Sequence, residues 1–352
     1  MNLPVRIVGT VPTEPVISVD GAFDAPGLNL SHWPGNRTPP GLRHDLSTGV
    51  ALAFGRLPAA ERVRLAAGAV AIVNNHYDTD GVCAAFATRH PNEALPRADA
   101  LLAAARAGDF YQLPDFDALA LDALVQAFAD PECSPVSAEL AGLTDHSRWT
   151  CAQNALLERL PAILDRRAGE GLDDYRELWQ PTVDGVEADL ADLRAAARED
   201  VLALDLTLWT AEEGAGSRRT GSRGLYDPGR HALFGSTSAD RALTVGPLAG
   251  GATYRLVVST LSWFDLVTET RLPRPDLEGL ARRLNAREGS VQEDELAWRW
   301  QPASNASPEL WFGGAELASF AEHNEVLSPS ELEPDVVVAE IERALSPGQR
   351  LS

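Results

Sequence analysis

The stretch AVAIVNNHYDTDGVCAAFATR (residues 69–89) predicts how the first part of the chain folds. Its opening run, AVAIV, is continuously apolar, which is typical of a strand buried on both faces of a parallel sheet. From Val82 onward the spacing of apolar residues becomes helical. The polar residues between them, NNHYDTDG, are therefore expected to form a loop at the carboxyl end of a strand. In open α/β sheets, ligands bind at that edge.

Upstream of this unit, VISVD (16–20) is a second short apolar run, closed by an acid. The segment that follows, residues 21–45, is rich in proline and glycine, which excludes a long helix or a central strand. A loop of this length is usually functional or disordered. Embedded apolar side chains favour an ordered loop here: Phe23, Leu28, Leu30 and Trp33.

Downstream, apolar spacing predicts helices over 59–68, most of 98–130, 151–167, 172–199 and 333–345, and strands over 201–210 and in the β-rich region 241–272. Residues 212–224 contain no apolar side chain larger than alanine and indicate a flexible loop or a boundary. We therefore expect an α/β fold, with a mainly parallel sheet in an N-terminal domain (1–200) and a smaller α+β C-terminal domain (225–347).

The composition narrows the range of functions. The 352 residues include 51 acids and 30 bases, all of them arginine, for a net charge of −21. Such a surface repels nucleic-acid backbones and anionic membranes. There is no apolar run of membrane-spanning length and no signal-peptide pattern, so a cytoplasmic protein is expected. The exclusive use of arginine is typical of high-GC bacterial genes. The three cysteines, Cys83, Cys133 and Cys151, lack CxxC spacing and indicate reduced thiols.

His76, Asp78 and Asp80 alternate along the loop after AVAIV. On an extended loop alternate side chains point the same way, so these three can converge on one cation. Carboxylate and imidazole ligands suit Mn²⁺, Mg²⁺ or Fe²⁺ better than a soft metal, which would recruit thiolates. The alternative is that Asp78 or Asp80 only caps the following helix and that His76 is solvated.

The residues HYDTDGVCAAFA resemble the first motif of the DHH phosphoesterase superfamily. The resemblance implies a parallel-sheet domain, a smaller C-terminal domain, and divalent ions, commonly manganese, that activate water for phosphoester hydrolysis. It makes His76, Asp78 and Asp80 metal ligands and Asp109 a further one. Asp145 and His146 match part of the Asp-His-His motif and are catalytic candidates, but Ser147 replaces its last histidine. SHWPGN (31–36) together with HYDTDG also resembles a bacterial domain family of unknown function.

Two other interpretations remain open. Asp78-Thr79-Asp80-Gly81-Val82 also fits the DxDGV motif of HAD-like phosphatases, in which the first aspartate is a nucleophile. Against it, four polar residues separate Asp78 from the apolar run, and the chain has no lysine to hold the phosphate. The missing histidine after His146 also allows a catalytically degenerate protein that binds a ligand or serves as a scaffold.

The expected activity is therefore metal-dependent hydrolysis of a small phosphorylated molecule, since the net charge disfavours a long polynucleotide. His32 and Asp45 lie on the proline-rich loop and are candidates to complete the metal shell or contact substrate. Arg218 and Arg219 are candidates to clamp a phosphate, because guanidinium groups match phosphate oxygens, although such a run can equally be a solvated loop.

Overall fold

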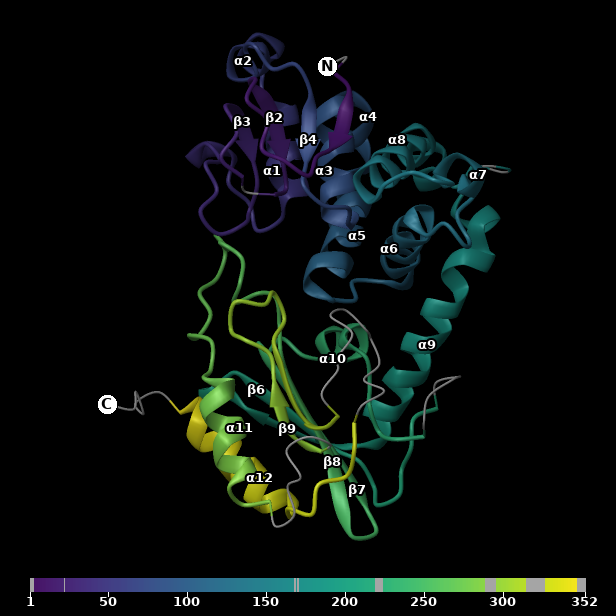
Figure 1. The fold of residues 1–352 in the computed structure, drawn as a ribbon. Coiled ribbons are helices and arrows are strands. Elements are labelled where there is room, and N and C mark those ends of the chain that lie inside the picture. The colour runs from purple at the N-terminus through teal and green to yellow at the C-terminus, as the bar shows by residue number, and fades with distance from the viewer. Residues whose placement is uncertain are drawn as a thin grey trace. The chain divides into compact units, whose positions relative to one another are not determined.

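The computed structural model describes residues 3–21, 23–167, 169, 171–218, 224–288, 296–314 and 327–346. The chain divides into two compact units. Unit 1 comprises Met1–Val183 and Phe264–Thr270, and unit 2 comprises Asp184–Trp263 and Arg271–Ser352. Figure 1 follows the chain through both units by colour.

Unit 1 is built on a four-stranded parallel sheet with the order β1-β4-β2-β3. All residues of β2 and β4 are buried, as their apolar sequences predict for central strands. Because β2 and β4 are parallel neighbours, the segments that follow them leave the sheet at the same edge. The four strands are β1 (Val5–Ile7), β2 (Val16–Val19), β3 (Gly27–Leu30) and β4 (Ile72–Asn74).

Helix α3 (Thr79–Arg89) is almost completely enclosed, with its first ten residues buried. It packs against α1 (Ser47–Arg56) and α5 (Ala98–Phe110). A helix buried on all sides has no solvent-facing polar stripe, and the residues from Val82 to Ala87 are all apolar, while Asp80 is buried in its first turn. The other helices are η1 (Pro40–Leu42), α2 (Ala59–Leu65), α4 (Pro91–Ala94), η2 (Leu95–Arg97), α6 (Phe116–Ala129), α7 (Ser137–Leu140), α8 (Asp145–Leu164), η3 (Leu172–Tyr175) and α9 (Arg176–Ala195).

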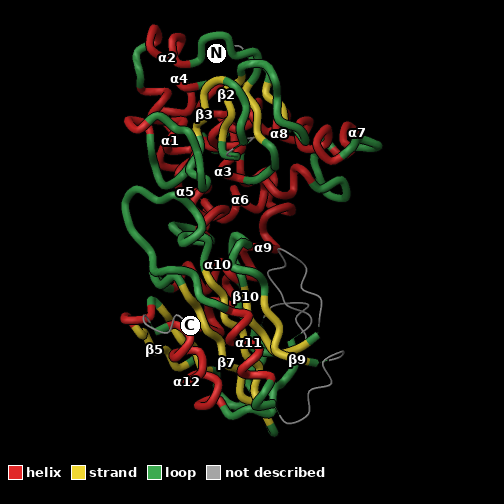
Figure 2. The backbone as a smooth tube through the Cα atoms, turned by 60° about the vertical axis from the view of Figure 1, so that its left-hand side comes forward, coloured by secondary structure: helices red, strands yellow, loops and turns green. Residues whose placement is uncertain are grey.

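Unit 2 holds a six-stranded mixed sheet with the order β5-β6-β7-β8-β10-β9, in which only the β6–β7 pair is parallel among the described pairs. Figure 2 shows the contrast between the mainly helical unit 1 and this sheet-rich unit. The strands are β5 (Ala197–Val201), β6 (Leu206–Thr210), β7 (Arg241–Leu248), β8 (Gly251–Val258), β9 (Ala297–Trp300) and β10 (Glu309–Gly313), and the helices are η4 (Leu202–Leu204), α10 (Arg230–Ser236), α11 (Leu277–Asn285) and α12 (Pro334–Leu345).

The apolar core of unit 2 lies between this sheet and helices α11 and α12. Helix α11 contributes buried residues at i, i+3, i+4 and i+7, which places them on one face. The strands contribute alternate residues such as Leu243, Val245, Tyr254 and Leu256. The helix side chains, which recur every 3.6 residues, and the strand side chains, which alternate every 2 residues, therefore pack into one core.

The expected α/β class is confirmed, with a parallel sheet in the N-terminal part and a mixed sheet with helices in the C-terminal part. The units divide within α9, at Val183, rather than near residue 200. Residues 263–272 do not form a strand. They follow an irregular path, and Phe264–Thr270 belongs to unit 1. Among the described residues, no helix combines the length and apolar character that crossing a membrane requires.

Candidate metal centre

Two groups of acids and histidines lie at the carboxyl edge of the parallel sheet in unit 1, and they share one aspartate. The buried group comprises Asp20, His32, Asp80 and Asp109, and the exposed group comprises Asp20, His76 and Asp78. Within each group the potential ligand atoms lie within 4.8 Å of one another. The two groups gather residues from the ends of β2, β3 and β4, from the start of α3 and from α5.

Asp20 directly follows β2, and its carboxylate faces both groups. Its Oδ2 lies 2.9 Å from Nε2 of His76, and its Oδ1 lies 3.7 Å from Nε2 of His32. The Ser47 hydroxyl donates to Oδ1 at 2.9 Å, and the Asn74 amide donates to Oδ2 at 3.4 Å. Its backbone has a φ of 62°, a conformation that costs free energy in a residue other than glycine. The surrounding bonds therefore hold a strained residue at the junction of the two groups.

In the buried group, three carboxylates surround the imidazole of His32. Its Nε2 lies 3.0 Å from Oδ2 of Asp109 and 3.5 Å from Oδ2 of Asp80. Its Nδ1 donates to the backbone carbonyl of Asp45 at 2.5 Å, because a carbonyl oxygen can only accept. In the neutral ring this leaves Nε2 with a lone pair, and Nε2 has no hydrogen-bond partner among the described residues. A lone pair facing carboxylates is the arrangement of a metal-ligating histidine.

In the exposed group, both ring nitrogens of His76 have hydrogen-bond partners. Its Nε2 lies 2.7 Å from Oδ2 of Asp78, and its Nδ1 bonds to the Asn75 side-chain oxygen at 2.7 Å. Asp78 also caps α3, because its Oδ1 accepts from the backbone N–H of Gly81 at 2.8 Å. Capping and ligation are therefore compatible: one oxygen caps the helix and the other faces the histidine. The side chains of His76 and Asp78 are 26% and 29% exposed, so solvent reaches this group.

Asp80 joins the start of α3 to the start of α1. Its two oxygens accept from the backbone N–H groups of Ser47 and Thr48, both at 2.7 Å. These are the first residues of α1, so the positive end of that helix faces the carboxylate. Burial and the neighbouring Asp20 still raise the pKa of Asp80 to about 6. The helix terminus therefore offsets only part of the negative charge.

The other pKa shifts in the two groups differ in direction. Burial would raise the pKa of Asp20, but His76 and His32 lower it. Burial and the carboxylate of Asp80 hold the pKa of Asp109 well above its usual range. Burial alone would lower the pKa of His76, but Asp78 and Asp20 raise it well above 6.5. The pKa shifts of Asp80, Asp109 and His76 favour the form of the group that carries less negative or more positive charge. A bound cation would relieve the same excess of negative charge.

Gly81 is required for close packing rather than for a special backbone conformation. A Cβ atom at this position would lie 2.3 Å from the Asn74 amide nitrogen and 2.9 Å from Oδ1 of Asp78. Real Cβ atoms do not approach other atoms that closely, so any side chain would displace these groups. The DG pair of the motif therefore places the helix start directly against the end of β4.

Most of the sequence-predicted residues of unit 1 lie in or beside the two groups. His76, Asp78, Asp80 and Asp109 are members, and so is His32. Asp45 is not a member, but its carbonyl accepts from His32, as described above. The sequence interpretation missed Asp20 as a member. An acid immediately after a buried strand was the available signal, and it matches the position of the HYDTDG loop after β4.

Asp145 and His146 lie in neither group. Both are in the first turn of α8, where Asp145 forms an ion pair with Arg148 at 3.0 Å. The ring of His146 packs edge-on against Trp149 and leaves no room for a side chain at Gly9. Their expected catalytic role therefore has no support from the geometry, because α8 uses them at its own N-terminus.

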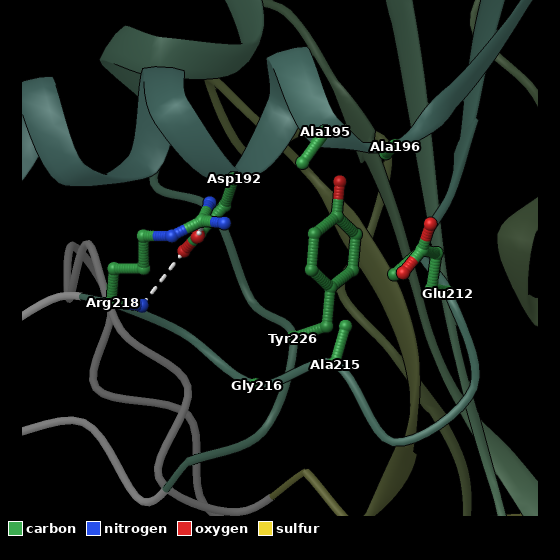
Figure 3. Close-up of a pocket in the computed structure, with 9 residues that line it drawn as sticks. Asp192, Ala195, Ala196, Glu212, Ala215, Gly216, Arg218 and Tyr226 are labelled. Atoms are coloured by element: carbon green, nitrogen blue, oxygen red, sulfur yellow. Dashed lines mark hydrogen bonds and ion pairs between the residues drawn. The ribbon is translucent and has the colours of Figure 1, made fainter.

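Arg218 belongs to unit 2 and lines a pocket of about 160 Å³ there (Figure 3). Its guanidinium donates to Oδ1 of Asp192 at 2.7 Å, and its backbone N–H donates to Oδ2 at 2.9 Å. The figure shows the ring of Tyr226 between Asp192 and Glu212. Asp192 thus balances the charge of Arg218, and the expected phosphate clamp has no direct support. Arg219 lies outside the described residues.

The chain belongs to a family of unknown function, DUF6687, whose model matches residues 8–351. No curated protein and no solved structure matches the chain. The chemistry of the two groups is therefore the basis for the function proposed below.

Proposed function

We propose that this member of the family is a metal-dependent phosphoesterase that hydrolyses a small phosphorylated molecule. The position of Asp20 carries the proposal, because each oxygen of its carboxylate faces a different histidine. Phosphatases and nucleases with two ions hold them about 3.5–4 Å apart to act on one phosphoryl group. A carboxylate that contributes one oxygen to each group suits such a pair.

The donor set fits a hard or borderline divalent cation. The two groups offer four carboxylates and two imidazoles, and no thiolate among the described residues. Such ligands select manganese, magnesium or iron(II) over metals that prefer sulfur. Both histidines also have the supporting hydrogen bond at Nδ1 that ligating histidines need. We therefore propose Mn²⁺, with Mg²⁺ as the second choice.

Divalent cations bound here would lower the pKa of a water molecule and offset charge on the phosphoryl oxygens. The residues themselves hold the ligands in place. Ser47 and Asn74 fix the two oxygens of Asp20, and the first turn of α1 fixes Asp80. Substrate would reach the exposed group, because His76 and Asp78 are about a quarter exposed and the buried group is closed to solvent.

The charge of the protein supports a small substrate. A chain with net charge −21 repels a long polyanion along its whole length, whereas a small phosphate ester meets mainly the local field of the site. The ion-pair partners that the structure gives Asp20, Asp78 and Asp80 are histidines. Without cations these acids would repel a phosphate, so we expect binding of substrate to require the metal.

The proposal is tested by elemental analysis of the purified protein together with a phosphatase panel in Mn²⁺. We expect stoichiometric metal, hydrolysis of at least one small phosphate ester, and loss of both in Asp20→Asn. The matched control is Asp24→Asn, which changes an exposed acid four residues further along that pairs only peripherally with Arg37, at 3.6 Å. It is expected to retain metal and activity.

Two outcomes separate the proposal from its alternatives. Metal without hydrolysis of any ester would favour the catalytically degenerate binding protein. Hydrolysis that survives Asp20→Asn but not Asp78→Asn would favour the HAD-like mechanism, with Asp78 as nucleophile. In the structure both oxygens of Asp78 are already engaged, one by the α3 cap and one by His76, which supports the metal-ligand role.

A further inference from the structure

Seven residues, Phe264–Thr270, belong to unit 1 although the chain on both sides of them belongs to unit 2. This 264–270 segment is irregular in structure and packs against the loop that carries His32 and Asp45. The sequence of the segment has no pattern of core residues that would explain why it belongs to unit 1. The contacts it makes indicate what it does.

The segment is held by the carboxylate of Asp45. The backbone N–H groups of Val267 and Thr268 donate to its Oδ1 at 2.6 and 3.1 Å, and the Thr268 hydroxyl donates to its Oδ2. Burial would raise the pKa of Asp45, but these bonds keep it below its usual range. Three donors on one largely buried carboxylate make a specific attachment, since hydrogen bonds to a charged acceptor are the strong ones.

The same segment also contacts His32 directly. The ring of Phe264 stacks on the His32 imidazole, with centroids 3.9 Å apart and planes 17° apart. The backbone N–H of Asp265 donates to the carbonyl of His32 at 2.9 Å. Phe264 also meets Phe110 edge to face at 5.7 Å, beside Asp109. One face of the imidazole is thus covered by a flat apolar surface.

Asp45 connects these two sets of contacts. Its side chain binds the segment, and its backbone carbonyl accepts the Nδ1–H of His32. The imidazole is therefore held by a hydrogen bond at Nδ1 and by stacking on its face. The segment supplies the stacking ring, and it binds the side chain of the residue that accepts the hydrogen bond. Together the hydrogen bond and the stacking leave Nε2 directed at Asp20, Asp80 and Asp109. Such outer contacts of a ligating histidine set its tautomer and orientation, and losing one costs 10–100-fold in metal affinity.

We propose that the 264–270 segment is a positioning element of the metal centre, which holds His32 in the orientation that completes the buried group. The inference rests on the proposed function only in requiring that the buried group binds a cation. The segment is itself part of unit 1, and the chain on both sides of it belongs to unit 2. Phe264, Thr268 and Asp45 are the positioning residues.

The test is a calorimetric titration of metal-stripped full-length protein with Mn²⁺. In Phe264→Ala we expect one of the two ions to bind 10–100-fold more weakly. The other ion, at the exposed group, is expected to keep its affinity within about twofold. The matched control is Phe116→Ala, which changes an exposed phenylalanine at the start of α6 and is expected to leave both affinities unchanged.

A second pair of variants keeps the test independent of any folding defect in Phe264→Ala. Thr268→Val removes the hydroxyl that donates to Asp45, and Thr268→Ser restores it. We expect the valine variant to weaken the same ion and the serine variant to recover it. Thermal unfolding in EDTA identifies variants that do not fold. Equal Mn²⁺ affinities in the wild type, Phe264→Ala and Thr268→Val would overturn the inference.

Failure of the proposed function has a different signature. If the wild type binds two ions but hydrolyses no ester, the affinities still decide the role of the segment. If the wild type binds no ion, histidine long-range ¹H–¹⁵N spectra of the metal-free protein decide it. We expect His32 to show the Nδ1–H tautomer in the wild type and to lose it in Phe264→Ala. An unchanged tautomer in that variant would overturn the inference.

Discussion

Two networks of buried charged side chains differ in how they are balanced. In unit 2, Arg255 lies between Glu309 and Asp227, with contacts of 2.8 Å to each, and Arg230 pairs with Glu309. Two positive charges thus meet two negative charges. In unit 1, four carboxylates meet two imidazoles. Among the described residues, the charges of the unit 2 network pair one to one, whereas in unit 1 the carboxylates outnumber the imidazoles.

The pKa shifts separate the two networks in the same way. Burial opposes the charged form of Arg255, but Asp227 and Glu309 outweigh it and raise its pKa. Burial would raise the pKa of Glu309, but Arg255 and Arg230 lower it. Arg255 and Glu309 therefore both remain charged. The pKa of Asp80 shifts the other way, to about 6, because its burial and the carboxylate of Asp20 outweigh the opposing effects of His32 and Thr48. The two networks thus differ in the balance of their buried charges and not in burial itself.

The largest expected effect breaks the balanced network. Arg255→Leu leaves Asp227 and one side of Glu309 without their cation, and we expect it to lower the free energy of unfolding by about 3–5 kcal/mol. The measurement is urea denaturation in EDTA at pH 7. The control is Arg343→Ala, because Arg343 is half-exposed and Glu340 keeps Arg283 and Arg287. We expect it to cost less than about 1 kcal/mol. If Arg343→Ala lowers the free energy of unfolding by more than about 1 kcal/mol, the comparison is refuted.

The next effect concerns the unbalanced network. Mn²⁺ at a hundredfold excess over its Kd is expected to stabilise the wild type by about 2.7 kcal/mol. In the metal-free protein, Asp80 has a pKa of about 6 and therefore gains a proton as the pH falls from 7.5 to 5, while the raised pKa of His76 favours its protonated form. These protons must leave before Mn²⁺ binds. The stabilisation is therefore expected to shrink by about 1.4 kcal/mol per pH unit for each proton displaced.

This pH dependence is measured as the difference in unfolding temperature with and without Mn²⁺ at each pH. Taking the difference removes the titration of groups outside the site, such as His44 and His90, which contribute equally to both series. A stabilisation by Mn²⁺ that grows toward pH 5 would contradict the assignment of these ligands.

The smallest expected effect is the change in stability on replacing one aspartate by asparagine, and it has opposite signs in the two networks. Burial and Asp80 raise the pKa of Asp109, so this carboxyl group costs the folded, metal-free protein stability once the pH exceeds the ordinary range of an aspartate. We expect Asp109→Asn to stabilise the protein in EDTA at pH 8 by on the order of 1 kcal/mol and to abolish the stabilisation by Mn²⁺. Asp227→Asn, in the balanced network, is expected to destabilise it. Chemical denaturation of both variants measures the signs, and a loss of stability in both would remove the distinction.

Much of the parallel-sheet region could be predicted because its signals are local. The apolar run AVAIV predicted a buried strand, and β4 (Ile72–Asn74) occupies the end of that run; the run before Asp20 was noted as apolar but was not assigned to a strand. The alternation of His76, Asp78 and Asp80 predicted ligands on one side of a loop. The prediction of β structure in residues 263–272 was wrong. The apolar and threonine-rich sequence of this region resembles a strand, but its backbone N–H groups bond to His32 and Asp45 instead of a neighbouring strand.

The candidate site could be predicted only in part, because its members are far apart in the sequence. Asp20 and His76 are 56 positions apart, and they meet only because β2 and β4 are neighbours in the sheet. His32 could be nominated as a loop residue, but its orientation depends on Phe264 from the other end of the chain. Asp145 and His146 matched a motif by residue type alone, and α8 places them outside both groups.

The amino-acid sequence alone determined the α/β class, the strand–loop–helix unit around HYDTDG and the excess of acid over base, since these follow from local periodicity and composition. Tertiary structure decided that Asp20 joins two groups, that Asp45 links His32 to the 264–270 segment, and that the buried arginines of unit 2 are already paired. The physical reason is that ligation and charge balance depend on distances of about 3–4 Å between side chains. Strand order and chain path set those distances.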